Sequence, residues 1–493
     1  MPFCKKKLKV DEKAVLRKEI GVLQGVSIII GVIIGSGIFV SPVGVLKHTH
    51  SVGLSFVIWL LTGVFSIIGA LVYAELGVTI PLSGGEYIYI LKTFGGLLAF
   101  CCLWITFLLI GAASTAANAF IFAQYLLKPL FLECEIPASA QICLGLFGVF
   151  TLLAINCYNV KWAAKLAIVF TVGKVSALLL IIGLGLFNIF MGRSDSFNEP
   201  FAGSNFNAGS LSLAFYHGFW AFAGWNYLNF LTEEMKNPSR NLPIAILLSL
   251  LIVTSVYIMV NVAYLGVLTP REMLIAGESS SAIAVGFAER TMGSFSWIMP
   301  ICVAASVFGS MNGEILSMSR LTYAGANEKH LPTVISMISK SHLTPMPSII
   351  IMGVVVICFQ LSLDVFYLIE LAGFAYTVIF AMATCSLLYI RHKSHETKTK
   401  FRLNIIIPIT FLIVDIFVAV LALYQQPKES LIGIGIMILG VPIFLVGVSW
   451  KDKPKSFNNF TENLTVWAQK LLLVIPPDAE DDKNPEHYIT NEC

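Results

Sequence analysis

Three glycines, Gly31, Gly35 and Gly37, lie within one apolar run that covers residues 20–46. Each glycine costs a helix about 1 kcal/mol relative to alanine, so we expect the helix to be interrupted here. A helix that restarts near Ser36 presents unpaired N–H groups and a partial positive charge, and both suit a carboxylate. The alternative is that the glycines only allow a second helix to pack closely.

A second apolar run, residues 209–232, carries Gly218, Gly224 and Asn226. Unwinding near Gly224 would free backbone carbonyls, which can accept hydrogen bonds from an ammonium group. The two runs are the first and sixth in the chain, as expected if spans one to five and six to ten are inverted repeats. Together the two breaks would bind a zwitterion such as a free amino acid. Alternatively, Gly224 serves helix packing, and Asn226 and Asn229 form interhelical hydrogen bonds.

Lys174 lies in the middle of the apolar run at residues 163–190. A charge at the centre of a membrane helix costs about 2.5–3.5 kcal/mol on insertion scales, so a partner is expected. We expect Lys174 to hold the interrupted first span through hydrogen bonds to its carbonyls, in the place of a coupling cation. The alternative is that its side chain extends to the membrane surface.

Membrane helices are the elements that must position these residues. Of the 493 residues, 57% are hydrophobic and 12% are charged, whereas soluble domains contain about 25% charged residues. We therefore predict an all-α protein embedded in the lipid bilayer. Roughly 12 transmembrane helices are expected, from apolar runs at residues 20–46, 53–76, 97–127, 138–157, 163–190, 209–232, 243–268, 295–323, 347–363, 365–389, 403–424 and 430–449.

Most Lys and Arg residues lie in the N-terminal tail, the even-numbered loops and the C-terminal tail. Because membrane-protein segments rich in Lys and Arg stay in the cytoplasm, both termini are predicted to be cytoplasmic. The predicted organisation is a tail at residues 1–19, a transporter domain at residues 20–450 and a second tail at residues 451–493. The sequence contains no nucleophile–base pair and no metal-ligand spacing, so we expect no enzyme activity, no cofactor, no metal and no nucleic-acid partner.

Several motifs resemble the light chains of heteromeric amino acid transporters, within the amino acid–polyamine–organocation superfamily. The resemblance implies a LeuT-like fold, with inverted repeats at about residues 20–190 and 209–390 and two extra helices at about 403–449. It also implies sodium-independent exchange of amino acids by alternating access. The motifs are Gly31–Pro42, Tyr73–Gly77, Ser83–Tyr87, Ala223–Glu234, Asn237–Pro243 and Phe308–Gly313.

The resemblance also implies roles for single residues. The backbone at Ser36 and Gly37 would bind the substrate carboxylate, and the carbonyls of Ile33, Trp220 and Ala223 would bind its ammonium group. Trp220 occupies the position of the aromatic gate that closes over the substrate.

Two more polar residues match the family. Asn226 resembles the family's supporting polar residue, and Lys174 matches its fifth-span lysine.

Cys134 lies in the loop after the third span, where light chains form a disulfide to a single-pass heavy-chain glycoprotein. An odd cysteine in an oxidising external loop agrees with intermolecular pairing, although a free loop thiol is the alternative. Such a heterodimer is expected in the plasma membrane.

Substrate choice depends on the pocket walls. The cystine/glutamate exchanger light chain, which this chain resembles, has arginines where this chain has Gly111 and Tyr376. The cystine/dibasic type has an acidic residue at the position of Ala223. We therefore predict an uncharged pocket for neutral amino acids, including large and aromatic ones, as in the aromatic-preferring light chain. The pocket would be lined by Gly111, Ser114, Trp220, Phe222 and Tyr376.

Two other functions stay open. One is exchange of cystine with anionic or dibasic amino acids. The other is an amino acid sensor or trafficking partner that binds substrate without useful turnover.

Overall fold

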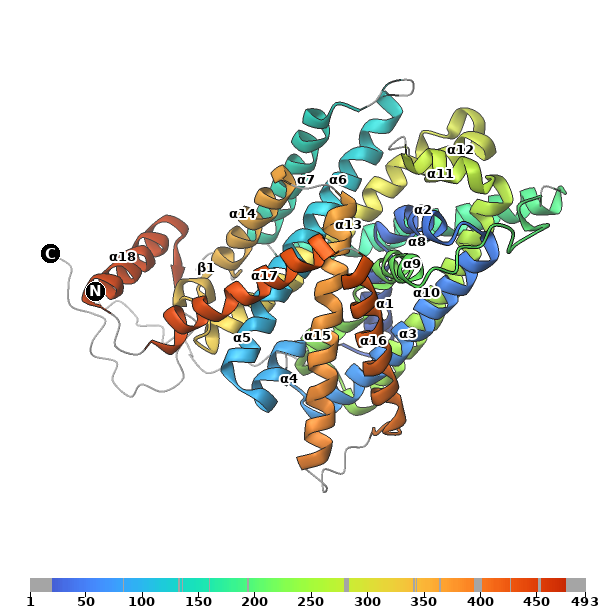
Figure 1. Cartoon of the computed structure of the whole chain (residues 1–493). Coiled ribbons are helices and arrows are strands. Elements are labelled where there is room, and N and C mark those ends of the chain that lie inside the picture. The colour runs from blue at the N-terminus through green and yellow to red at the C-terminus, as the bar shows by residue number, and fades with distance from the viewer. Residues whose placement is uncertain are drawn as a thin grey trace.

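The computed structural model describes residues 20–475, except residues 83, 132, 133, 135, 159, 193, 194, 279–282, 340, 341, 343, 363, 364, 394–400, 426 and 451–453. The predicted N-terminal tail and the end of the predicted C-terminal tail lie outside this part of the chain. Within it the protein is a bundle of long helices (Figure 1), which confirms the all-α prediction.

Long apolar helices make up most of the bundle, and each rises 1.5 Å per residue across a hydrocarbon core of about 30 Å. In the described part, nine helices are long and apolar enough to cross a membrane, and a bent pair forms a tenth such segment. Seven of these nine are uninterrupted: α3 (Val52–Thr79), α7 (Ala138–Tyr158), α8 (Val160–Phe190), α10 (Pro238–Val267), α13 (Ile298–Asn327), α15 (Val365–Lys393) and α16 (Ile406–Gln425). The shorter helix α14 (Met346–Ser362) is also uninterrupted.

Two further spans contain a π-helical turn. The third span consists of α5 (Gly96–Ile105), the π turn η1 (Thr106–Ala112) and α6 (Ala113–Leu127), and the last consists of α17 (Pro427–Phe444) and η7 (Leu445–Ser449). The two predicted spans outside the ten long segments correspond to α14, which has 17 residues, and to a broken helix described below.

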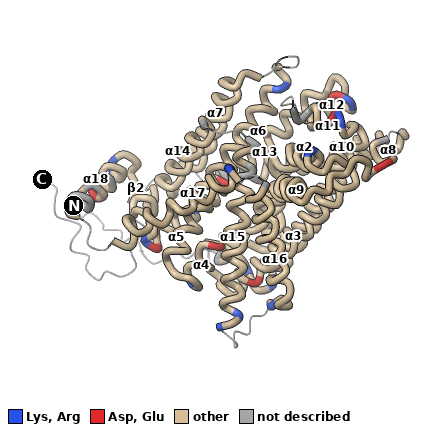
Figure 2. Tube along the Cα trace, in the orientation of Figure 1, with Lys and Arg blue, Asp and Glu red and all other residues tan. Residues whose placement is uncertain are grey.

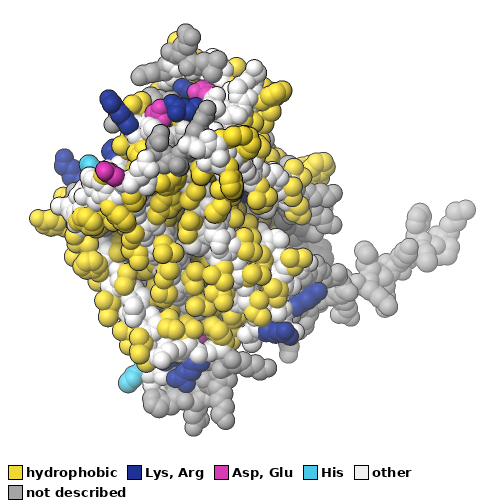
Figure 3. All heavy atoms as spheres, turned by 90° about the vertical axis from the view of Figure 1, so that its right-hand side faces the viewer, with side chains coloured by type: hydrophobic (Ala, Val, Ile, Leu, Met, Phe, Trp, Pro, Cys, Tyr) yellow, Lys and Arg dark blue, Asp and Glu magenta, His cyan; other side chains and the backbone are white. Residues whose placement is uncertain are grey.

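The outer surface of the bundle matches a lipid environment. Leu60 and Leu61 of α3 and Leu251 of α10 are about half exposed. Figure 3 shows one face of the bundle, with hydrophobic side chains spread over its middle and charged side chains gathered toward its two ends. Along the chain trace, too, most Lys, Arg, Asp and Glu residues lie near helix ends and connections (Figure 2). The protein is therefore a multi-pass membrane protein.

Short elements connect the spans. They are α4 (Gly85–Phe94), η2 (Lys128–Leu130), η3 (Asp195–Phe197), α11 (Pro270–Glu278), α12 (Ile283–Met292), η5 (Gly293–Phe295) and η6 (Thr333–Ser336). After the last span, α18 (Lys455–Leu472) leads to β2 (Val474–Ile475), which pairs antiparallel with β1 (Ile338–Ser339). This pairing joins the segment after α18 to the loop between α13 and α14.

The first apolar run forms two helices, α1 (Val22–Ile33) and α2 (Gly37–Thr49), whose axes differ by 52°. The sixth run forms α9 (Ala208–Phe222) and the 3-10 segment η4 (Trp225–Glu234). Between α9 and η4, Gly224 has a φ of +108°, a backbone conformation that residues with a Cβ rarely adopt. Both predicted helix breaks are therefore present.

The two breaks pack against each other. A Cβ on Gly37 would collide with the backbone of Ala221 in α9, and a Cβ on Gly224 would lie 2.5 Å from Cγ1 of Val32. Close packing and interruption were alternatives for these glycines in the sequence, and the structure shows both. This contact brings the start of α2 next to the end of α9.

Candidate functional site

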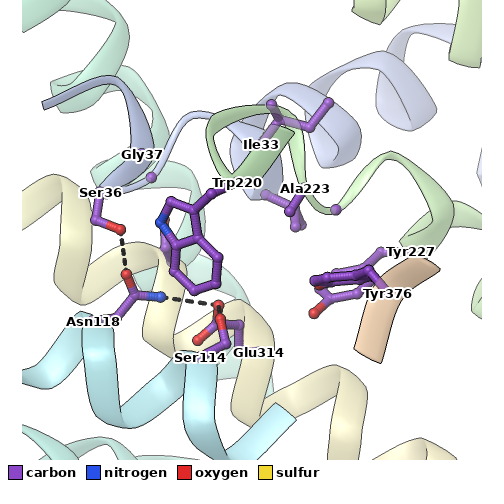
Figure 4. Close-up of a pocket in the computed structure, with 14 residues that line it drawn as sticks. Ile33, Ser36, Gly37, Ser114, Asn118, Trp220, Ala223, Tyr227, Glu314 and Tyr376 are labelled. Carbon is purple, nitrogen blue, oxygen red and sulfur yellow. Dashed lines mark hydrogen bonds between the residues drawn. The ribbon is translucent and has the colours of Figure 1, made fainter. Parts of the chain in front are cut away.

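A pocket lies at the two helix breaks. Seven of the residues predicted to bind substrate line it: Ile33, Ser36, Gly37, Ser114, Trp220, Ala223 and Tyr376. Figure 4 shows Trp220 extending between the broken segments at one side and the side chains of Ser114 and Glu314 at the other. The remaining lining residues are Val32, Gly35, Asn118, Gly224, Tyr227, Ser310 and Glu314.

The start of α2 provides hydrogen-bond donors at the pocket. Gly37 is the first helical residue, so the N–H groups of this turn have no partner within α2. The 13 residues of α2 also give this end a partial positive charge. The Ser36 hydroxyl donates to Oδ1 of Asn118 from α6. This arrangement suits a carboxylate.

Side chains from neighbouring helices hold the carbonyls at the end of α1. Nζ of Lys174 donates to the carbonyl oxygen of Gly31 at 2.7 Å and to Oγ of Ser310 at 3.3 Å. The Tyr257 hydroxyl lies 3.0 Å from the carbonyl oxygen of Ile33. The predicted hydrogen bond from Lys174 to a first-span carbonyl is therefore present. Its side chain is 1% exposed and does not extend to the surface.

Tyr257 also connects the two broken helices. The same hydroxyl lies 2.9 Å from the carbonyl oxygen of Ala221 in α9. Since one hydroxyl has one hydrogen, it donates to one of these two carbonyls at a time. Sequence reasoning missed this residue, because a tyrosine in the apolar seventh span reads as a packing residue.

Two of the residues predicted to bind substrate, Gly111 and Asn226, lie outside the lining. Gly111 lies in the π turn η1, and a Cβ there would be 2.6 Å from Cγ of Met318 in α13. Gly111 therefore permits close packing of the third span on α13. Asn226 is buried, and its Nδ2 donates to Oε1 of Glu86 at 3.2 Å. This bond joins η4 to α4.

The prediction of an uncharged pocket is wrong, because Glu314 of α13 lines it. Oε1 of Glu314 accepts hydrogen bonds from Oγ of Ser114 at 2.6 Å and Nδ2 of Asn118 at 2.9 Å. Oε2 accepts one from Oγ1 of Thr115 at 3.0 Å. The available signal was an acidic residue inside an apolar run, one helical turn after Ser310.

Phe222, also expected in the pocket, packs elsewhere. Its ring is tilted against those of Trp59, at 6.1 Å, and Tyr257, at 5.1 Å. Aromatic side chains in the pocket come instead from Trp220, Tyr227 and Tyr376. They give it apolar walls that can stack on a flat substrate side chain.

Cys134 is exposed in the connection between α6 and α7. Among the residues that the structure describes, no group of three or more His, Cys, Asp or Glu side chains is arranged to hold a metal ion.

Comparison with known proteins adds to this geometry. A family model described as amino acid permease matches residues 20–450. The chain is 41% identical to the large neutral amino acids transporter small subunit 2 of Homo sapiens, over 96% of this chain and 88% of that protein. It is also 41% identical to the human cystine/glutamate transporter, over 96% and 93%. Identity to the human Asc-type amino acid transporter 1 is 40%, over 96% and 90%.

Proposed function

Because the chain belongs to the amino acid permease family, whose members transport amino acids and are not enzymes, we propose that it is a sodium-independent exchanger of neutral amino acids, including large and aromatic ones. The observation that supports this most is the pairing of free N–H groups at Ser36 and Gly37 with the interrupted ends of α1 and α9. One side of the pocket can take a carboxylate, and the other can take an ammonium group.

The proposed roles follow from this geometry. The N–H groups at Ser36 and Gly37 bind the carboxylate, and the carbonyls of Ile33, Trp220 and Ala223 bind the ammonium group. Trp220 is 8% exposed and extends across the pocket, as expected for a gate over the substrate. Rocking of the broken helices against the other spans would then expose the pocket to each side in turn.

The walls support neutral substrates. Trp220, Tyr227 and Tyr376 offer apolar surface and stacking, and Ala223 leaves space beside them. Glu314 adds a carboxyl group that would repel an anionic side chain if it is ionised. Exchange of cystine with glutamate is therefore disfavoured, although a cystine/glutamate transporter is as similar as the large neutral relative.

We also propose that the chain works at the plasma membrane as the light subunit of a heterodimer, with both termini in the cytoplasm. One relative is named as a small subunit, which supports assembly with a larger partner. Exposed Cys134 would form the disulfide to a single-pass heavy chain.

Trans-stimulation tests the exchange function. Cells that co-express the heavy chain would be loaded with unlabelled leucine and then offered labelled tyrosine. We expect faster uptake than in unloaded cells, because each entry would be coupled to an exit. Equal uptake in loaded and unloaded cells would contradict exchange, and stronger competition by cystine or glutamate than by leucine would contradict the neutral assignment.

A further inference from the structure

Among the 14 residues that line the pocket, Glu314 alone carries an acidic or basic side chain. It is 8% exposed, so most of its surface is covered by the protein. An ionised group buried in a membrane bundle is costly unless other groups compensate for its charge.

The surroundings of Glu314 fit an ionised carboxylate. Ser114, Thr115 and Asn118 all donate hydrogen bonds to it, from one face of α6. Ser310 precedes Glu314 by one turn of α13, and its Oγ accepts from the ammonium group of Lys174 at 3.3 Å. A positive charge therefore lies next to Ser310, one turn of α13 from the carboxylate.

Glu314 still has capacity to accept another hydrogen bond. A carboxylate offers about four acceptor positions, and three are occupied by these donors. Lys174 is not among the lining residues, whereas Glu314 is. A bound molecule would therefore meet the negative member of this pair of charges.

The direction of a bound amino acid follows from the broken helices. With its carboxylate at Ser36 and its ammonium group near Ile33, its side chain would extend toward the part of the pocket lined by α6 and α13. Figure 4 shows Glu314 and Ser114 at the opposite side of Trp220 from Ile33 and Ala223. A long substrate side chain that passes beside Trp220 would reach Glu314.

We propose that Glu314 selects substrates by their side chains: it accepts a hydrogen bond from a side-chain donor such as the phenol of tyrosine, and it excludes side chains that carry a negative charge. This inference rests on the proposed binding of amino acids in the pocket. It narrows the substrates to long side chains that end in a hydrogen-bond donor.

Competition binding tests this selection without requiring turnover. The heterodimer in lipid nanodiscs would bind labelled tyrosine, and unlabelled tyrosine, phenylalanine or glutamate would be added as competitors. Tyrosine and phenylalanine differ only by the hydroxyl group. A hydrogen bond to a charged acceptor corresponds to about tenfold in affinity, so we expect about tenfold weaker competition by phenylalanine and none by glutamate.

Substitution then assigns the effect to Glu314. Glu314→Gln keeps the shape and removes the charge, so the tyrosine preference should shrink toward equality and glutamate should begin to compete. Glu289→Gln, at an exposed position of α12, is the control and should behave as the unmodified protein.

Three results would overturn the assignment. They are equal competition by tyrosine and phenylalanine in the unmodified protein, an unchanged preference in Glu314→Gln, and strong glutamate binding before any substitution. The first and third need no variant, so they decide the matter even if Glu314→Gln does not fold. Selective binding without trans-stimulation would support this inference while contradicting the proposed exchange function.

Discussion

Gly37 of α2 lies so close to Ala221 of α9 that a Cβ on Gly37 would overlap the Ala221 backbone. The two interrupted helices therefore meet at the point where α2 begins. The hydrogen-bond donors at the start of α2 depend on this contact for their position, because a larger residue would push the two helices apart.

Gly37→Ala should therefore abolish uptake of labelled tyrosine and lower the stability of the protein. Overpacking of a close contact costs about 1–3 kcal/mol, and here the displaced backbone belongs to the site itself. Uptake would be normalised to the amount of protein at the cell surface. Gly183→Ala in α8 is the matched control, since a Cβ there meets nothing within 4 Å. Normal uptake by Gly37→Ala would mean that the helices can move apart without loss of function.

Lys174 should make transport independent of sodium. Its ammonium group already holds the Gly31 carbonyl at 2.7 Å, so no coupling cation is needed to hold the end of α1. Replacement of external sodium by choline should leave uptake unchanged, and Lys174→Met should lose most of it. Lys92→Met, on the exposed side of α4, serves as the control. A fall in uptake on removal of sodium would refute this role.

Cys134→Ser should remove the covalent link to the heavy chain. The thiol is exposed in the connection between α6 and α7, so a partner can reach it. On a non-reducing gel we expect a heterodimer band for the unmodified protein and only separate subunits for the variant. Cys143→Ser, also exposed but within α7, should keep the band. Persistence of the band in Cys134→Ser would assign the link to another cysteine.

Glu86 should make stability depend on pH. It lies in α4, between two candidate spans, and burial raises the pKa of its carboxyl group from the usual value to about 7. Between about pH 4.5 and pH 7 the folded state then binds more protons than the unfolded state. The free energy of unfolding therefore falls by up to about 3 kcal/mol as the pH rises through this range. It stays at this lower value above pH 7.

Glu86→Gln should remove this loss while keeping the hydrogen bond from Asn226. We expect a higher apparent melting temperature than that of the unmodified protein at pH 8, and little difference at pH 4.5. Glu328→Gln, at an exposed position after α13, should show no such difference at either pH. A gain of the same size at both pH values would show that Glu86 does not titrate as described.

Much of the fold follows from local features of the sequence. A long apolar run must form a helix in a membrane, because its backbone groups have no other partners there. Gly224 marks a break, because its φ of +108° is costly for residues with a Cβ. Lys174 needed a buried polar partner wherever the fifth span was placed, since an unpaired charge is too costly. A bond to a first-span carbonyl was one of the two outcomes considered for it, and the structure contains that bond.

The misjudged residues depend on how helices are rotated. The π turn η1 changes the direction in which the third span presents its side chains. Gly111 thus faces Met318, while Ser114 faces the pocket. The sequence alone gives no sign of such a turn. Because this turn was not foreseen, the resemblance to other light chains led to the prediction that Gly111 lies in the pocket.

The sequence by itself determined that the protein is a helical membrane protein with two interrupted helices, because hydrophobic length and glycine spacing act locally. Only the tertiary structure decided which side chains meet at those interruptions. Glu314 faces the pocket and Asn226 faces Glu86 because of how α13 and η4 pack against their neighbours. Helix packing depends on contacts between residues far apart in the chain, and a single sequence does not list those contacts.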